Sequence, residues 1–178
     1  SEELERQSKL ENIKRSYGIK MRITKKPWYL ILQDISNATG KQKQEVMKEH
    51  KDDEVLQQVL HFIYSPRIVT GISEKKLSKE GISKEDSYTG TLGIVDLMNY
   101  LKLNSTGTDK TVALCQEYLE STYNAIEREM TRALILKDLP IGISGSTINK
   151  VWPNLIPVFK LMKGKKYEAK DINVPFTL

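Results

Sequence analysis

The chain has 178 residues and a formal net charge of +5, with 39% hydrophobic and 29% charged residues, which fits one packed domain with extensions. Its single cysteine, Cys115, excludes a disulfide framework and a cysteine-based zinc site. No apolar run approaches the roughly 18 residues of a membrane span, and the charged N-terminus lacks a signal-peptide core, so we expect a cytosolic protein that contacts no membrane.

Residues 1–27 read as a charged N-terminal extension. Residues 1–16 carry few apolar side chains, which predicts a marginal helix that Gly18 breaks. Residues 19–26 alternate apolar and basic side chains up to Pro27, which is typical of an extended segment. The basic side chains there could contact an anion, although a solvated arm is the simpler interpretation: Lys20, Arg22, Lys25 and Lys26.

The next part of the chain, residues 28–64, predicts three helices from the helical spacing of its apolar residues. The first covers residues 28–38, and Thr39 is the expected N-cap of the second, over residues 41–48. Asp52 or Asp53 is expected to begin the third. His50 and His61 lack a second ligand at metal-binding spacing, so we expect neither to bind a metal.

Residues 65–136 predict a long polar loop followed by helices. We expect at most one short helix in residues 65–90, then a buried helix over residues 92–101. Thr108 or Asp109 caps a further helix, which is expected to continue, bent near Thr122, towards Ala133. No strand pair is visible, so the fold class is all-α, a compact domain of about seven or eight helices.

Helical periodicity predicts which large side chains are buried. These are Trp28, Leu60, Ile63, Leu97, Leu101, Leu119, Leu134, Val151 and Trp152.

Residues 130–157 read as helix, sharp glycine turn and helix. Pro140 is expected to stop the first helix, and Gly142 gives the turn its backbone freedom. Ser144 or Ser146 is the expected N-cap of the second helix. A helix N-terminus beside small residues attracts a phosphate, although an ordinary helical hairpin is the simpler interpretation of the spacing alone.

The net positive charge is confined to the C-terminal part of the chain. Residues 1–130 hold 20 basic and 20 acidic side chains, whereas residues 131–178 hold 8 basic and 3 acidic ones, beside the glycine turn. A basic region on a neutral body predicts a polyanionic partner, most often nucleic acid, and a solvated lysine-rich tail is the alternative.

Signals of catalysis are absent from the sequence. There is no phosphate-binding Walker loop, no dinucleotide fingerprint and no nucleophile–base spacing, so we name no catalytic or metal-binding residue. Lys84-Glu85-Asp86-Ser87 comes near the Lys-x-Asp-Gly motif of covalent nucleotidyltransferases, but serine replaces the glycine and the segment lies in a polar loop. We therefore reject it.

Several segments resemble the helical DNA-binding domain of bacteriophage ATP-dependent DNA ligases. The most specific is the run Asn-Lys-Val-Trp-Pro of residues 149–153, preceded by Lys137-Asp138-Leu139, Gly142, Ser144 and Thr147. Residues 40–44, 50–56, 64–65 and 92–98 match in the same order, so the resemblance covers roughly residues 28–157.

The resemblance implies three parts: an extension of residues 1–27, a helical DNA-binding domain of residues 28–163, and a linker of residues 164–178. The linker would lead to an absent nucleotidyltransferase domain, so this chain should be inactive alone and need no cofactor, whereas the parent enzyme would use ATP and Mg²⁺. The implied partner is nicked or duplex DNA, contacted by a monomer at the minor groove and phosphates without sequence preference, in replication, repair and recombination in the cytoplasm of a bacterial host.

Carried over residue by residue, the resemblance implies one set of DNA-binding residues. They are Lys137, Gly142, Ser144, Ser146, Thr147 and Lys150. Two alternatives stay open: a helix-hairpin-helix protein, whose Pro-Gly-Ile-Gly order residues 139–145 do not meet, and a helical adaptor that binds proteins. A helix-turn-helix regulator is weaker, because only Asn149 and Lys150 could read bases.

Overall fold

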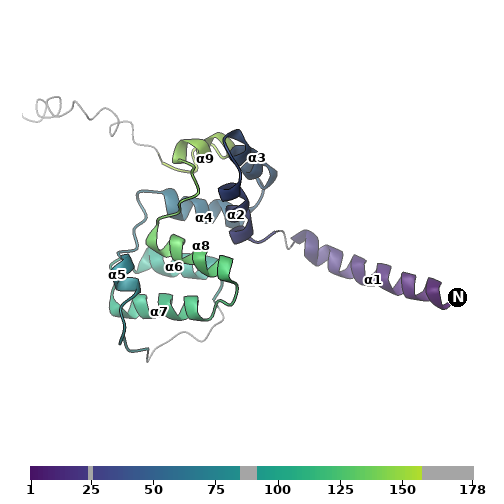
Figure 1. Ribbon diagram of the computed structural model, residues 1–178, viewed down its shortest axis with the longest axis horizontal. Coiled ribbons are helices and arrows are strands. Elements are labelled where there is room, and N and C mark those ends of the chain that lie inside the picture. The colour runs from purple at the N-terminus through teal and green to yellow at the C-terminus, as the bar shows by residue number, and fades with distance from the viewer. Residues whose placement is uncertain (24–25, 85–91, 158–178) are drawn as a thin grey trace, which may run out of the picture.

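The computed structural model describes residues 1–23, 26–84 and 92–157, with the backbone alone for residues 14–23, and these residues form nine α-helices and no strand (Figure 1). The predicted all-α class is confirmed. The helices are α1 (Glu2–Ile23), α2 (Trp28–Asn37), α3 (Lys41–Glu49), α4 (Glu54–Tyr64), α5 (Glu74–Leu77), α6 (Ile94–Leu103), α7 (Asp109–Glu120), α8 (Ala125–Leu136) and α9 (Gly145–Val151).

Helix α1 stands apart from the other helices (Figure 1). The prediction of a break at Gly18 and an extended segment after it is wrong, because α1 runs through Gly18 to Ile23. A glycine inside a helix costs only about 1 kcal/mol relative to alanine, which does not end a helix by itself. The few large apolar side chains of its first half, Leu4, Leu10 and Ile13, are exposed.

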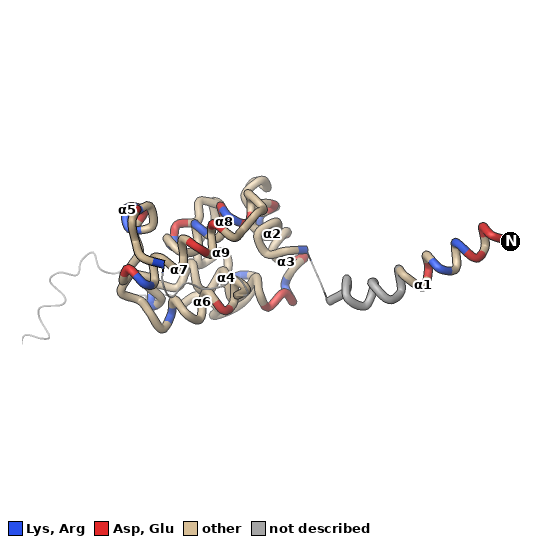
Figure 2. The backbone as a smooth tube through the Cα atoms, turned by 90° about the horizontal axis from the view of Figure 1, so that it is seen from below, with Lys and Arg blue, Asp and Glu red and all other residues tan. Residues whose placement is uncertain are grey.

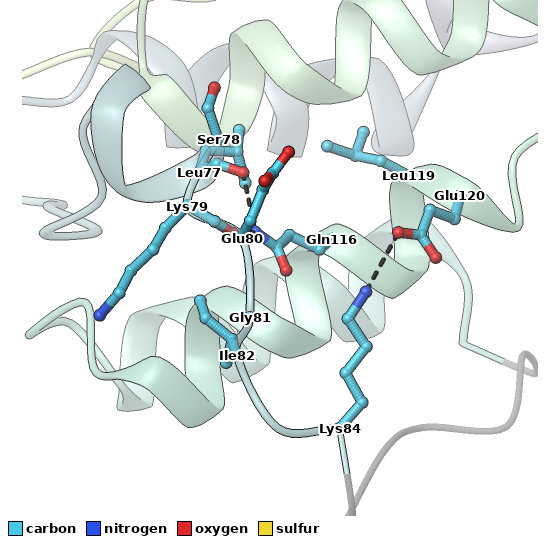
Figure 3. Close-up of a pocket in the computed structure, with 10 residues that line it drawn as sticks. All are labelled: Leu77, Ser78, Lys79, Glu80, Gly81, Ile82, Lys84, Gln116, Leu119 and Glu120. Atoms are coloured by element: carbon cyan, nitrogen blue, oxygen red, sulfur yellow. Dashed lines mark hydrogen bonds and ion pairs between the residues drawn. The ribbon is translucent and has the colours of Figure 1, made fainter.

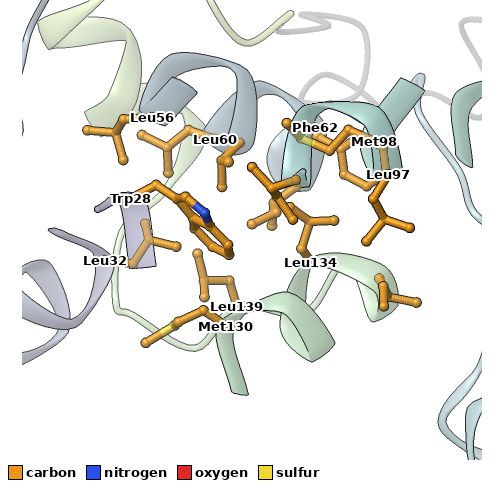
Figure 4. Close-up of a cluster of buried hydrophobic side chains, with 14 of the residues drawn as sticks. Trp28, Leu32, Leu56, Leu60, Phe62, Leu97, Met98, Met130, Leu134 and Leu139 are labelled. Atoms are coloured by element: carbon orange, nitrogen blue, oxygen red, sulfur yellow. The ribbon is translucent and has the colours of Figure 1, made fainter. Parts of the chain in front are cut away.

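The hydrophobic core lies between α2, α4, α6, α7 and α8, with α9 closing one end (Figures 1 and 4). Leu60, Phe62, Leu97 and Leu134 are fully buried there. All nine side chains that periodicity marked as buried are buried, which confirms that prediction. Each of the helices α2 to α9 contributes buried apolar side chains to this core, as an amphipathic helix does in a small domain.

Side-chain caps fix three of the predicted helix starts. Asp53, Thr108 and Ser144 each accept a hydrogen bond from the backbone N–H three residues later, at the starts of α4, α7 and α9. Thr39 does not cap α3: the residue before that helix is Gly40, at φ +54°, and no side chain caps it. A glycine adopts this left-handed backbone at little cost, so it sets the start of the helix instead.

Helices α7 and α8 are separate, so the expectation of one bent helix is wrong. Asn124 caps α8 by accepting the N–H groups of Ile126 (2.9 Å) and Glu127 (3.0 Å). The Arg128 guanidinium donates to the carbonyl oxygen of Thr122 and closes the turn. The end of α8 also differs from the prediction, because Lys137 at φ +54° terminates it before Pro140 is reached.

Residues 65–84 form the predicted loop with one short helix, α5. This loop and the loop after α6 meet backbone to backbone at two glycines. A Cβ on Gly107 would lie 2.0 Å from the carbonyl oxygen of Gly71, and both glycines have positive φ. The Lys76 amino group also donates to Gly71 O at 3.0 Å, so this hydrogen bond holds Gly71 in place where Gly107 packs against it.

Candidate functional site

The turn between α8 and α9 is held against the rest of the domain by a lysine from α3. The Lys43 ammonium donates to the carbonyl oxygens of Ile35 (2.9 Å) and Ser36 (3.3 Å) at the end of α2, and to that of Ile141 (2.9 Å) in the turn. One side chain therefore joins the C-terminus of α2, α3 and the turn. A lysine can do this because its ammonium carries three donors.

Gly142 lies beside this lysine, with φ +74° and an exposed backbone. A Cβ there would approach the Lys43 side chain at 3.3 Å from Cε. The glycine is thus needed for its left-handed conformation, and its close approach to Lys43 leaves little room for a side chain. The sequence predicted Gly142 as a site residue but not Lys43, which lies in the matching stretch of residues 40–44 and whose partner Ile141 is 98 residues away.

Three hydroxyl groups gather at the start of α9. Ser144 Oγ lies 2.9 Å from Ser146 Oγ and 3.1 Å from Thr147 Oγ1, and it accepts the Thr147 N–H at 3.3 Å. The N-terminus of α9 is therefore capped by its own serine. Ser144 and Ser146 are exposed, so the cluster presents hydroxyl groups to solvent that can donate to an acceptor such as a phosphate oxygen.

Two exposed lysines lie on the helices next to the turn. Lys150 is on α9, four residues after Ser146, and Lys41 opens α3, which packs against α9. Neither makes a hydrogen bond or ion pair with the residues that the structure describes. We call Lys41, Gly142, Ser144, Ser146, Thr147 and Lys150 the α3–α9 surface. Five of the six predicted site residues belong to it.

Lys137, the sixth predicted residue, has a different environment. Its ammonium donates to the carbonyl oxygens of Ser65 and Ile68, in the loop after α4. The side chain is half-buried, and this burial lowers the pKa of Lys137. The same end of α8 is held by Thr70 Oγ1, which donates to Ile135 O at 2.8 Å. The structure thus gives Lys137 a role in fixing the end of α8 that the sequence did not indicate.

Asn149 links the two ends of the α9 region. Its side-chain amide donates to Ile156 O at 2.9 Å and accepts the Ile156 N–H at 2.8 Å. Trp152 Nε1 donates to Lys51 O at 2.7 Å, which ties the end of α9 to the α3–α4 turn. Asn149 and Trp152 therefore each fix one side of this segment. They also occupy the Asn149 amide, which removes one of the two side chains available to a helix-turn-helix reader.

Acidic and basic residues are interspersed along most of the described chain (Figure 2). Of the predicted basic C-terminal region, Arg132 forms an ion pair with Glu74, and Lys137 and Lys150 lie as described above. The other basic residues of that region, Lys160, Lys163, Lys165, Lys166 and Lys170, lie outside the described residues, as does the predicted linker of residues 164–178.

A hollow of about 460 Å³ between α5 and α7 is lined by apolar side chains (Leu77, Ile82 and Leu119) and by polar ones (Lys79, Lys84 and Glu120), and we call it the α5–α7 hollow (Figure 3). At its rim the Lys84 ammonium pairs with Glu120 at 3.1 Å, and Gln116 donates to the carbonyl oxygens of Leu77 and Lys79. Lys84 is therefore a surface ion-pair partner here, and the residues after it lie outside the described part of the chain.

Nucleophilic and metal-binding groups are scarce in the described residues. The Cys115 thiol is buried, and burial raises its pKa to about 12, so it is neutral at physiological pH. Within residues 1–23, 26–84 and 92–157 no three His, Cys, Asp or Glu side chains are placed to hold a metal ion. No helix of this described part is long and apolar enough to span a membrane.

Comparisons with known proteins agree with the resemblance seen in the sequence. No family model matches the chain. The chain is 31% identical over 147 residues to the DNA ligase of Enterobacteria phage T4, and equally to that of Enterobacteria phage T6. The match covers 80% of this chain but 29% of each ligase, so the chain spans less than a third of the length of these curated relatives.

Proposed function

Because the chain is homologous to a region of phage DNA ligases, we propose that it binds duplex DNA, without sequence preference, as the DNA-binding domain of an ATP-dependent ligase that seals nicks. The observation that carries this proposal is the sequence match over 80% of the chain. In this proposal residues 28–163 are the DNA-binding domain, residues 164–178 lead to the adenylylation domain, and the protein acts as a monomer in the host cytoplasm during replication, repair and recombination.

The α3–α9 surface supports a contact with phosphates rather than with bases. Its lysines and hydroxyls are the side chains that commonly bind DNA phosphates, and such contacts position a protein without reading sequence. Gly142 adds no side chain at the turn, so a phosphate could approach its backbone, and Lys43 fixes the turn. Asn149, which could have read a base edge, is bonded to Ile156 instead. As the resemblance to the ligase domain implies, we propose that this surface contacts the minor-groove side of nicked duplex.

In this proposal the adenylylation domain of the full-length ligase, and not the described domain, carries out catalysis. ATP and Mg²⁺ would act outside the described residues, which hold no acidic cluster arranged for a metal ion. We expect that incubation of the chain with ATP adds no AMP to its mass and that the chain alone seals no nick. A mass gain of one AMP would contradict this division of roles.

The test is a fluorescence anisotropy titration of a labelled nicked duplex over a range of salt concentrations. We expect a dissociation constant of about 10⁻⁴ to 10⁻⁶ M at physiological salt, as for other sequence-independent binders. Lys150→Ala or Lys41→Ala should lower affinity on every sequence and reduce the salt slope by about 0.9 for each phosphate that the variant no longer neutralises. Lys110→Ala, an exposed lysine on α7, is the matched control and should bind as wild type does.

Gly142→Val provides a second, independent test of the α3–α9 surface. A β-branched residue is strained at φ +74°, and its Cβ would displace Lys43. We expect weaker binding with an unchanged salt slope, because the turn is distorted while no charge is removed.

Wild-type binding of DNA with no effect of either lysine variant would place the contact elsewhere. Lys137→Ala is also expected to weaken binding, but its result must be read together with stability, because Lys137 supports the end of α8. Complete indifference of the chain to duplex DNA would favour the helical protein adaptor instead.

A further inference from the structure

Helix α9 is tied to α3 at both of its ends. Before α9 begins, the carbonyl oxygen of Ile141 accepts a hydrogen bond from the Lys43 ammonium at 2.9 Å. After α9 ends, Trp152 Nε1 donates to the carbonyl oxygen of Lys51, just beyond α3, at 2.7 Å. The two helices therefore run side by side in the same direction (Figure 1). The hydroxyl groups of the α3–α9 surface lie at the end that Lys43 holds: Ser144, Ser146 and Thr147.

The Lys43 ammonium has no donor left for a phosphate. It donates to the carbonyl oxygens of Ile35 (2.9 Å), Ser36 (3.3 Å) and Ile141 (2.9 Å), and an ammonium has three donors. Its side chain is half-buried, whereas Lys41 on the same helix is exposed. A phosphate oxygen could bond to the Lys43 ammonium only by displacing one of these carbonyl oxygens.

The three carbonyl oxygens depend on the ammonium to different degrees. Ile35 O also accepts the Ala38 N–H at 3.2 Å, whereas Ser36 O and Ile141 O have no other donor within the described part of the chain. Two of the three belong to the C-terminal end of α2, where the helix dipole favours a positive charge. Without the ammonium, three partially negative oxygen atoms would converge on one point, and the turn at Ile141 would lose its tie to α2 and α3.

We infer that Lys43 is a positioning residue for DNA binding, which holds the turn and the hydroxyl groups after it in the arrangement that binds a phosphate, without contacting the DNA itself. This inference rests on the proposed function of the α3–α9 surface. Ser144 follows Ile141 by three residues, and a Cβ on Gly142 between them would lie 3.3 Å from Lys43 Cε. A shift of the turn therefore moves the hydroxyl groups. A surface that is ordered before binding also loses less conformational entropy when it binds.

The experiment compares Lys43→Met with two control variants of the full chain, by anisotropy titration of nicked duplex over a range of salt concentrations. Methionine keeps the apolar stem of Lys43 and removes its ammonium. Lys110→Met removes the same charge from an exposed position on α7. Gln116→Leu removes another side chain that joins distant backbone carbonyl oxygens, those of Leu77 (3.0 Å) and Lys79 (2.7 Å), between α5 and α7. Circular dichroism checks that each variant is folded in the titration.

We expect Lys43→Met to bind nicked duplex at least about tenfold more weakly, which corresponds to the loss of one hydrogen bond to a charged group. Its salt slope should equal that of wild type, because no phosphate contact is removed. Both controls should bind as wild type does, although Gln116→Leu should unfold at a lower urea concentration. If Lys43→Met does not fold, Lys43→Gln replaces it, and its two amide donors should preserve part of the affinity at the same unchanged slope.

Three results would overturn the positioning role. A salt slope lowered by about 0.9 in Lys43→Met would mean that the ammonium itself neutralises a phosphate. Wild-type affinity of this variant would mean that the turn does not need the ammonium. Equal weakening by Gln116→Leu would mean that DNA binding follows the general stability of the domain.

A double variant tests whether Lys43 and Gly142 act through the same turn. Lys43→Met and Gly142→Val should each displace the same hydroxyl groups, so the double variant should bind no more weakly than the weaker of the two single variants. Losses that multiply would show that the two residues act independently, which contradicts the proposal.

The outcomes also separate this inference from the proposed function. If wild type binds DNA and Lys150→Ala weakens binding while Lys43→Met binds as wild type, only the role of Lys43 is refuted. If wild type does not bind duplex DNA, the proposed function is refuted, and the role of Lys43 with it.

Discussion

Replacement of Lys137 by methionine should destabilise the domain. The sequence alone would predict an exposed lysine at this position, beside a glycine turn, whose replacement has little effect on stability. Methionine keeps the apolar stem and the left-handed backbone of the residue, at φ +54°, and removes only the ammonium. The carbonyl oxygens of Ser65 and Ile68 then lose the ammonium as a donor, while Ser65 O still accepts the Ile68 N–H at 3.2 Å. Ser65 is only 1% exposed, so water cannot easily replace the ammonium at its carbonyl.

The magnitude follows from the two acceptors. A hydrogen bond to a charged group contributes about 1.5–3 kcal/mol, and the buried Ser65 O keeps one donor, the Ile68 N–H, so no fully unpaired buried acceptor is added to this cost. Ile68 is half-buried and can be hydrated in part, and removal of the ammonium also relieves its desolvation. We therefore expect Lys137→Met to lower the free energy of unfolding by about 2 kcal/mol. Lys137→Gly should lower it less, because glycine relieves about 1 kcal/mol of left-handed strain.

The assay is urea unfolding followed by circular dichroism. Lys150→Met is the matched control, since an exposed lysine without such contacts should change stability by no more than about 0.5 kcal/mol. Equal unfolding midpoints for Lys137→Met and wild type would refute the structural role of the ammonium.

A dependence on pH provides a second check on Lys137. Burial lowers the pKa of Lys137 below its ordinary 10.5, so the unfolded chain binds more protons between the lowered value and 10.5. The stability of wild type relative to Lys137→Met should therefore rise with pH across that window. A constant difference would mean that burial does not perturb this lysine.

Two further predictions concern the loops and the core. Gly107→Ala should destabilise the domain by at least about 3 kcal/mol, because the new Cβ would lie 2.0 Å from Gly71 O. The control is Gly81→Ala, which also has positive φ but no atom within 4 Å of the new Cβ, and it should cost only about 1 kcal/mol. Similar urea midpoints for the two variants would contradict the glycine contact. Cys115 should react with a thiol reagent only after unfolding. Rapid labelling of the native protein would refute the burial of this thiol. Burial raises the pKa of Cys115 from 9.0 to about 12, so the unfolded thiol deprotonates first as pH rises. Wild type should therefore become less stable relative to Cys115→Ala between pH 9 and pH 12.

The sequence alone determined the features that depend on near neighbours. Asp53, Thr108 and Ser144 could each be predicted as one of two candidate caps, because each bonds a backbone N–H three residues ahead. The core side chains could be predicted because a buried helix face repeats every three or four residues. The relationship to DNA ligases could also be predicted, from the run around Asn149 and Trp152.

Only the tertiary structure decided how the charged residues of the candidate site are used. Lys137 and Lys150 both read as free lysines beside a glycine turn, yet one donates to carbonyl oxygens 69 and 72 residues away and the other is exposed. Nothing near Lys43 in the sequence indicated its contact with the turn, although its ammonium fixes the turn from α3. Periodicity and capping reflect interactions within one helix turn, whereas the partner of a lysine ammonium depends on which distant backbone carbonyls the folded chain brings within its reach.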